Sequence, residues 1–141
     1  MYQVMEPIPR GGDKANRNHI VLVVDDDSAV KNSLKFMIEV EGFEVNAYSS
    51  AHELLNEDSL PANSCLVTDY HMPDMTGLEL VAQLRDRRIS IPAILMTAHP
   101  TDNLRNRAAA AGISIVEKPL LGGDLLDAIR DVFDGHAKSS L

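Results

Sequence analysis

The feature that most constrains how this chain folds is a set of short apolar runs that each end at a polar residue. Ile20–Val24 is an unbroken aliphatic run, and residues 65–68, 92–96 and 113–116 repeat the pattern with few polar interruptions. Runs without polar alternation predict strands buried on both faces, as in parallel sheets. Amphipathic helical segments separate the runs, and this alternation of strand and helix predicts helices on both faces of one sheet.

A fifth strand and the helix boundaries complete the predicted architecture. Residues 43–48 alternate apolar and polar side chains, which indicates a strand near the edge of the sheet. Gly42 and Gly112 end two helices, and Asp124 is the expected N-cap of the last one. We therefore predict an α/β fold of the flavodoxin-like (βα)5 type, a doubly wound parallel sheet with strand order 2-1-3-4-5.

Length and composition suit a single domain without disulfides. The chain has 141 residues, with 13 Lys and Arg against 21 Asp and Glu, and its net charge of −8 makes nucleic-acid binding a poor expectation. Cys65 is the single cysteine, no apolar run is long enough to span a membrane, and no secretory signal is visible. We expect a cytoplasmic protein that binds no membrane. We also expect a flexible N-terminal tail (1–18), a domain (19–134) and a C-terminal tail (135–141). The N-terminal tail is alternatively a docking segment.

Polar residues follow the predicted strands at a shared position, the carboxyl end. They are Asp25, Asp26, Asp27, Asp69, Thr97 and Lys118. The carboxyl ends of parallel strands meet at one edge, and ligands bind there where the strand order reverses, between the first and third strands. We therefore expect Asp25, Asp26 and Asp69 to converge, although the first three acids alone also suit a helix N-terminus.

Three carboxylates in one crevice predict a bound cation and phosphoryl chemistry. Like charges at short distance require a compensating cation, and Mg²⁺ favours carboxylate oxygens while leaving room for phosphate. Lys118 adds a positive charge and Thr97 a hydroxyl donor, which together suit phosphoryl transfer to a carboxylate. Taken alone, His71 and His99 are ordinary exposed loop histidines, and Cys65 is a small buried hydrophobic residue.

Four motifs now identify a family resemblance. They are Val23-Val24-Asp25-Asp26-Asp27, Asp69-Tyr70-His71-Met72-Pro73-Asp74-Met75-Thr76-Gly77, Met96-Thr97-Ala98 and Glu117-Lys118-Pro119. In this order and spacing, residues 19–134 resemble the receiver domain of two-component response regulators. They are most similar to receivers that usually precede a helix-turn-helix output, so we expect either a stand-alone receiver or one cut from a transcriptional regulator.

The resemblance implies a phosphorylation-activated switch and a metal site. Asp69 would accept a phosphoryl group from a sensor histidine kinase or phosphotransfer protein. Mg²⁺ would be held by Asp25, Asp26, Asp69 and the backbone carbonyl of His71. Such a chain is not an enzyme, apart from catalysing its own phosphorylation and dephosphorylation.

The resemblance also assigns roles around the phosphoryl group. Lys118 and Thr97 would contact its oxygens, and Pro119 would follow a cis peptide bond. His71 and His99 stand two residues after the acceptor and two after the threonine, where they would tune the lifetime of the phosphorylated state. Ile115 occupies a position where the family often has an aromatic switch residue, which puts an aromatic readout in doubt, and Leu120 stands where phenylalanine is frequent.

Two surfaces are candidates for partners. We expect the first helix, through Lys31 and Lys35, to dock the kinase. By analogy with the family, a homodimer would form through the fourth helix, fifth strand and fifth helix. The residues expected on that face are Leu104, Arg105, Arg107, Asp127 and Arg130.

Three other functions compete with the switch. Asp25-x-Asp27 is similar to the core of haloacid-dehalogenase-type phosphatases, with Asp25 as nucleophile, but Ala29 breaks that motif and Asp69 would have no role. An interaction module without chemistry would bind no Mg²⁺. A flavodoxin-like cofactor binder would need Ser, Thr or Gly in place of the three acids after the first strand.

Overall fold

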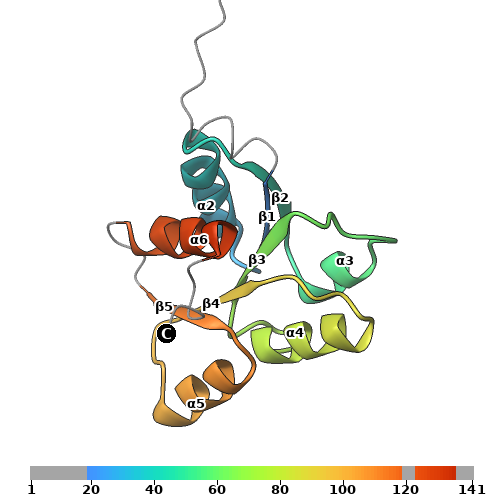
Figure 1. Cartoon of the computed structure of the whole chain (residues 1–141), viewed down its shortest axis with the longest axis vertical. Helices are drawn as coiled ribbons and strands as arrows, with labels where there is room; N and C mark the ends of the chain where they lie inside the picture. The colour runs from blue at the N-terminus through green and yellow to red at the C-terminus, as the bar shows by residue number, and fades with distance from the viewer. Residues whose placement is uncertain (1–18, 119–122, 136–141) are drawn as a thin grey trace, which may run out of the picture.

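The structure, a computed structural model, describes residues 19–118 and 123–135 and contains one five-stranded parallel sheet (Figure 1). Its strand order, β2-β1-β3-β4-β5, confirms the prediction. The strands are β1 (Ile20–Val24), β2 (Glu44–Tyr48), β3 (Ser64–Asp69), β4 (Ala93–Thr97) and β5 (Ser114–Glu117). The helices are α2 (Ser28–Val40), α3 (Ala51–Leu55), α4 (Gly77–Asp86), α5 (Asp102–Ala110) and α6 (Asp124–Asp134).

The sheet separates two apolar cores. Leu22 and Val24 of β1 face a core shared with α3, α4 and α5, whereas Val21 and Val23 face a core shared with α2 and α6. All four side chains are fully buried, which explains why β1 lacks polar alternation. Among the described residues, no helix is long and apolar enough to cross a membrane.

Side chains cap the N-termini of most of the helices. The predicted cap of the last helix, α6, needs a correction. Asp27 caps α2 by accepting hydrogen bonds from Ala29 N and Val30 N at 3.0 and 3.2 Å. The prediction that Asp124 caps α6 is wrong: Asp124 is the first helical residue, and the N-cap is Gly123, which offers no side-chain acceptor. The Asp124 carboxylate still lies at the positive end of the helix dipole.

The strand register fixes the backbone of the residues that follow the strands. Val24 of β1 pairs with Thr68 of β3, so Asp25 and Asp69 come next on neighbouring strands. Hydrogen bonds continue the ladders beyond the strand ends: from Asp25 N to Tyr48 O (3.1 Å), from Tyr70 N to Met96 O (2.9 Å) and from Lys118 N to Thr97 O (2.8 Å). The predictions for Pro119, Leu120 and residues 1–18 and 136–141 lie outside the described residues.

Gly77 lets α4 begin against the sheet. A Cβ atom at this position would lie 2.5 Å from Leu95 Cδ1 and 2.8 Å from the backbone oxygen of Asp69. Both distances are far below van der Waals contact, and the Asp69 backbone is held in the sheet. The missing side chain therefore sets how closely the β3–α4 loop returns to the end of β3.

We predict that Gly77→Ala lowers the free energy of unfolding by about 1–3 kcal/mol, the usual effect of overpacking a tight contact. Denaturant unfolding followed by circular dichroism measures this. Gly123→Ser is the control, because the nearest atom to a Cβ there is 4.0 Å away. A Gly77→Ala variant as stable as the wild type would contradict the close approach.

Candidate functional site

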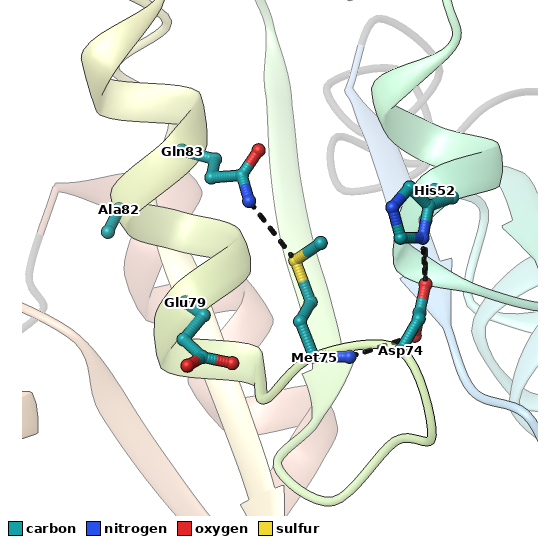
Figure 2. Close-up of a pocket in the computed structure, with 6 residues that line it drawn as sticks. All are labelled: His52, Asp74, Met75, Glu79, Ala82 and Gln83. Atoms are coloured by element: carbon teal, nitrogen blue, oxygen red, sulfur yellow. Dashed lines mark hydrogen bonds and ion pairs between the residues drawn. The ribbon is translucent and has the colours of Figure 1, made fainter.

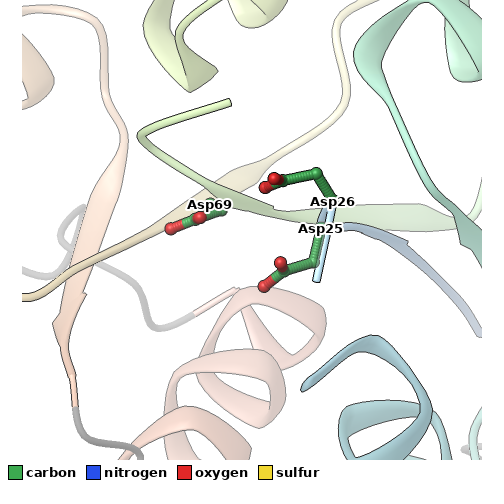
Figure 3. Close-up of side chains that lie close together, drawn as sticks. All are labelled: Asp25, Asp26 and Asp69. Carbon is green, nitrogen blue, oxygen red and sulfur yellow. The ribbon is translucent and has the colours of Figure 1, made fainter. Parts of the chain in front are cut away.

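Three carboxylates gather at the carboxyl edge of the sheet (Figure 3). Asp25 and Asp26 follow β1 and Asp69 ends β3, and each offers one oxygen such that the three oxygens lie within 4.8 Å of one another. Asp25 and Asp69 are buried, whereas Asp26 is exposed. The predicted convergence of these acids, which are far apart in the sequence, is present in the structure.

Lys118 and Thr97 approach the same cluster. Lys118 Nζ lies 3.0 Å from Asp69 Oδ1 and 4.0 Å from Asp25 Oδ2. Thr97 is buried at the end of β4, and its hydroxyl oxygen accepts a long hydrogen bond from His99 N at 3.4 Å. Lys118 thus pairs with two of the three carboxylates, which leaves an excess of negative charge among the described groups at this edge of the sheet.

Asp25 shows most clearly that the negative charge of the cluster is not fully compensated. Its Oδ1 accepts a hydrogen bond from Asp27 N at 2.9 Å, but its buried Oδ2 has no hydrogen-bond partner among the described residues. Burial, with a further contribution from the charge of Asp69, raises the pKa of Asp25 despite the Asp27 hydrogen bond and Lys118. A hard cation would satisfy this oxygen, so the carboxylate set fits Mg²⁺.

The third acid after β1 has a different task. Asp27 caps α2 and is not part of the metal-compatible cluster. Asp27 therefore confirms the helix N-terminus interpretation of the acidic run, whereas the ligand role of Asp25 and Asp26 stays a prediction.

The two loop histidines, His71 and His99, come two residues after Asp69 and Thr97 respectively, and both are exposed. The ring of His71 packs edge-on against Tyr70 with centroids 4.7 Å apart. His99 contacts Thr97 through its backbone. Neither position contradicts a role beside the acceptor, and that role stays a prediction.

Comparison with known proteins decides the family. The family model of the response regulator receiver domain matches residues 21–130. The chain belongs to this family. The transcriptional regulatory protein FixJ of Rhizobium meliloti is 38% identical over 114 residues, which cover 80% of this chain and 56% of FixJ. Nodulation protein W of Bradyrhizobium diazoefficiens is 35% identical over 120 residues, covering 84% of the receiver chain and 53% of that protein.

Solved structures agree with this assignment. The crystal structure of FixJ-N superposes with a TM-score of 0.74 at 36% identity, covering 84% of this receiver chain and 95% of that one. The response regulator StyR gives a TM-score of 0.75 at 35% identity, covering 86% of this chain and 62% of StyR. The receiver chain spans just over half the length of the curated relatives named above.

The proposed dimer face needs one correction. Leu104 is buried in the core beneath α5 and is not a surface residue. Arg130 is partly exposed and forms ion pairs with Asp127 of the same helix and with Glu41, which follows α2. Arg105, Arg107 and Asp127 are exposed as expected.

On the α2 surface, both lysines named for kinase docking have side-chain partners. Lys31 Nζ donates to Ser49 Oγ, and Lys35 Nζ pairs with Glu39, both at 2.6 Å. Sequence analysis missed that Phe36 and Val40 are the large hydrophobic side chains that α2 exposes, at 69% and 64%. The sequence contained a signal for this exposed pair: the two residues are four apart, which places them on one side of the helix, and they lie outside its buried stripe.

We predict that Asp25→Asn raises the stability of the metal-free receiver domain at pH 7, because it removes a charge that burial penalises. Since the folded-state pKa of Asp25 is raised, the penalty is fully present above that pKa and disappears as the pH falls toward the unfolded-state value. Chemical denaturation at pH 7 measures the effect. Added Mg²⁺ should stabilise the wild type more than the variant.

The control for this measurement is Asp58→Asn, which changes an exposed acid outside the cluster. It should leave both stability and the Mg²⁺ response unchanged. A loss of stability in Asp25→Asn without Mg²⁺ would contradict the unfavourable burial of this charge.

Proposed function

We propose that this receiver domain is a phosphorylation-activated switch in which Asp69 accepts a phosphoryl group from a histidine of a sensor kinase or phosphotransfer protein. The observation that carries the proposal is the 3.0 Å contact of Lys118 Nζ with Asp69 Oδ1, beside two further carboxylates. Asp25, Asp26, Asp69 and the backbone carbonyl of His71 would hold Mg²⁺. The bound ion would neutralise charge on the phosphoryl oxygens.

The transfer step uses the chain's own groups as follows. An Asp69 carboxylate oxygen forms a bond to phosphorus while the phosphorus–nitrogen bond of the donor phosphohistidine breaks. The bonding electron pair leaves with the imidazole nitrogen, which takes up a proton. Lys118 orients Asp69 beforehand and afterwards faces the phosphoryl oxygens, to which the Thr97 hydroxyl donates a hydrogen bond.

Phosphorylation then changes the balance at the sheet edge. A phosphoryl group adds about −1.5 to −2 charges at neutral pH. Lys118, which faces both Asp69 and Asp25, and the buried hydroxyl of Thr97 are the groups placed to respond. Ile115 is half-buried against the core of α3, α4 and α5, so a change there would be transmitted by aliphatic packing instead of an aromatic rotamer.

The phosphatase alternative has no support in the site or the comparisons. Its second acid would be Asp27, but this carboxylate accepts two backbone hydrogen bonds as the cap of α2. Its nucleophile would be Asp25, which is buried with only 1% of its surface exposed. The retained carboxylates and Lys118 likewise argue against an interaction module without chemistry.

Partner surfaces follow from the same proposal. The α2 face is the candidate for kinase docking, now including the exposed Phe36 and Val40. A homodimer through α5, β5 and α6 would use Arg105, Arg107 and Asp127. The dimer, the absence of nucleic-acid binding and the cytoplasmic location stay predictions from the sequence.

We predict that acetyl phosphate with Mg²⁺ adds one phosphoryl group per wild-type chain and none to Asp69→Asn, because the amide is a poor nucleophile. Intact-protein mass spectrometry measures the addition. Asp58→Asn should be labelled like the wild type. Labelling that survives in Asp69→Asn would eliminate Asp69 as the acceptor, and repeated turnover of a phosphoester would favour the phosphatase.

We predict that His71→Ala and His99→Ala each slow the decay of the phosphorylated protein. A general base typically contributes about a hundredfold or more, and we expect roughly two- to tenfold here because both imidazoles are exposed. The phosphoprotein remaining after removal of the donor is followed over time. Decay rates equal to that of the wild type would remove both residues as lifetime determinants.

A further inference from the structure

The β3–α4 loop, residues 70–76, contains a carboxylate that lies outside the metal-compatible cluster. Asp74 accepts hydrogen bonds from Met75 N (3.1 Å), His52 N (3.0 Å) and His52 Nδ1 (2.8 Å), as Figure 2 shows. Its side chain is only 18% exposed. Burial would raise its pKa, but the bonds from the His52 backbone and side chain prevail and lower the pKa of Asp74, so the carboxylate is ionised at neutral pH.

These bonds connect the loop to α3. His52 is the second residue of this helix, whose N-cap Ser50 accepts a hydrogen bond from Glu53 N at 3.1 Å. Asp74 therefore satisfies a second N–H group of the first turn, which has no partner within the helix. A helix of five residues is too short to be stable alone, so α3 and the loop hold each other in place.

Asp74 also makes the shortest polar contacts in the middle of the loop. The ends of the loop are fixed by hydrogen bonds from Tyr70 N to Met96 O and from Gly77 N to Tyr70 O, both 2.9 Å long. Between them, Met72 packs against the core of α3, α4 and α5, and its sulfur accepts a weak hydrogen bond from the Thr68 hydroxyl at 3.8 Å. The Asp74 contacts add short, charge-assisted hydrogen bonds to this apolar packing, and they tie the span from residue 71 to residue 74 to α3.

We propose that Asp74 is a positioning residue for the metal site: by binding His52, it fixes the loop that supplies the His71 carbonyl and thereby raises the affinity for Mg²⁺. This inference rests on the proposed function, which makes that carbonyl a ligand. Asp74 touches neither the ion nor the phosphoryl group in this role. Substituting a residue that orients a metal ligand without touching the metal commonly lowers the affinity for the metal.

The test compares the Mg²⁺ affinity of variants by isothermal titration calorimetry, well below their unfolding temperatures. Asp74→Ala should weaken binding roughly tenfold, and phosphorylation by acetyl phosphate should recover at saturating Mg²⁺. His52→Ala removes one of the three bonds and should have a smaller effect. It should add little in the Asp74→Ala background, because the two residues act through the same contact.

Controls separate this inference from a general loss of stability and from the proposed function. Asp131→Ala, at an exposed acid of α6, should bind Mg²⁺ like the wild type. If Asp74→Ala does not fold, Asp74→Asn keeps an oxygen for His52 N and should weaken binding roughly threefold. Wild-type affinity in the folded Asp74 variant overturns the positioning role. A wild type that neither binds Mg²⁺ nor becomes phosphorylated overturns the proposed function instead.

Discussion

The main physical constraint on this structure is the repulsion between acids that the parallel sheet brings together. The ends of β1 and β3 lie side by side, so Asp25 and Asp69 meet wherever this strand order forms. Lys118 offsets part of this repulsion at 3.0 Å from Asp69, and the buried Oδ2 of Asp25 gains no hydrogen bond from the described residues. The fold tolerates this cost because two apolar cores, one on each face, stabilise the sheet that imposes it.

Much of the fold could be predicted because burial and periodicity act locally in this sequence. The continuous run of β1 corresponds to a strand with apolar contacts on both faces, and the alternating residues 43–48 correspond to the edge strand β2. Errors arose where a single residue's surroundings decide its role. The predicted cap of α6, Asp124, lies one residue after the observed cap. Leu104 was expected on the surface but is buried, because α5 must bury at least one large side chain against the sheet.

The main site residues were predictable for a different reason. Asp25 and Lys118 directly follow strands and Asp69 is the last residue of one, so the topology alone determines that these three residues meet. The contacts that shape the surrounding loop left no such signal. His52 and Asp74 are 22 residues apart and meet only because α3 packs next to the loop after β3. The fit of Gly77 against the Asp69 oxygen likewise depends on a distance that no spacing in the sequence encodes.

The ladder bonds beyond the strand ends have a consequence for signalling. Because the amides of Asp25, Tyr70 and Lys118 are tied to neighbouring strands, the backbone beneath the site has little freedom to shift. Any signal that starts here must first travel through side-chain rotation and loop displacement. The sheet backbone then keeps its position while side chains and the loop move. Its amides would therefore remain protected from hydrogen exchange with solvent in either signalling state.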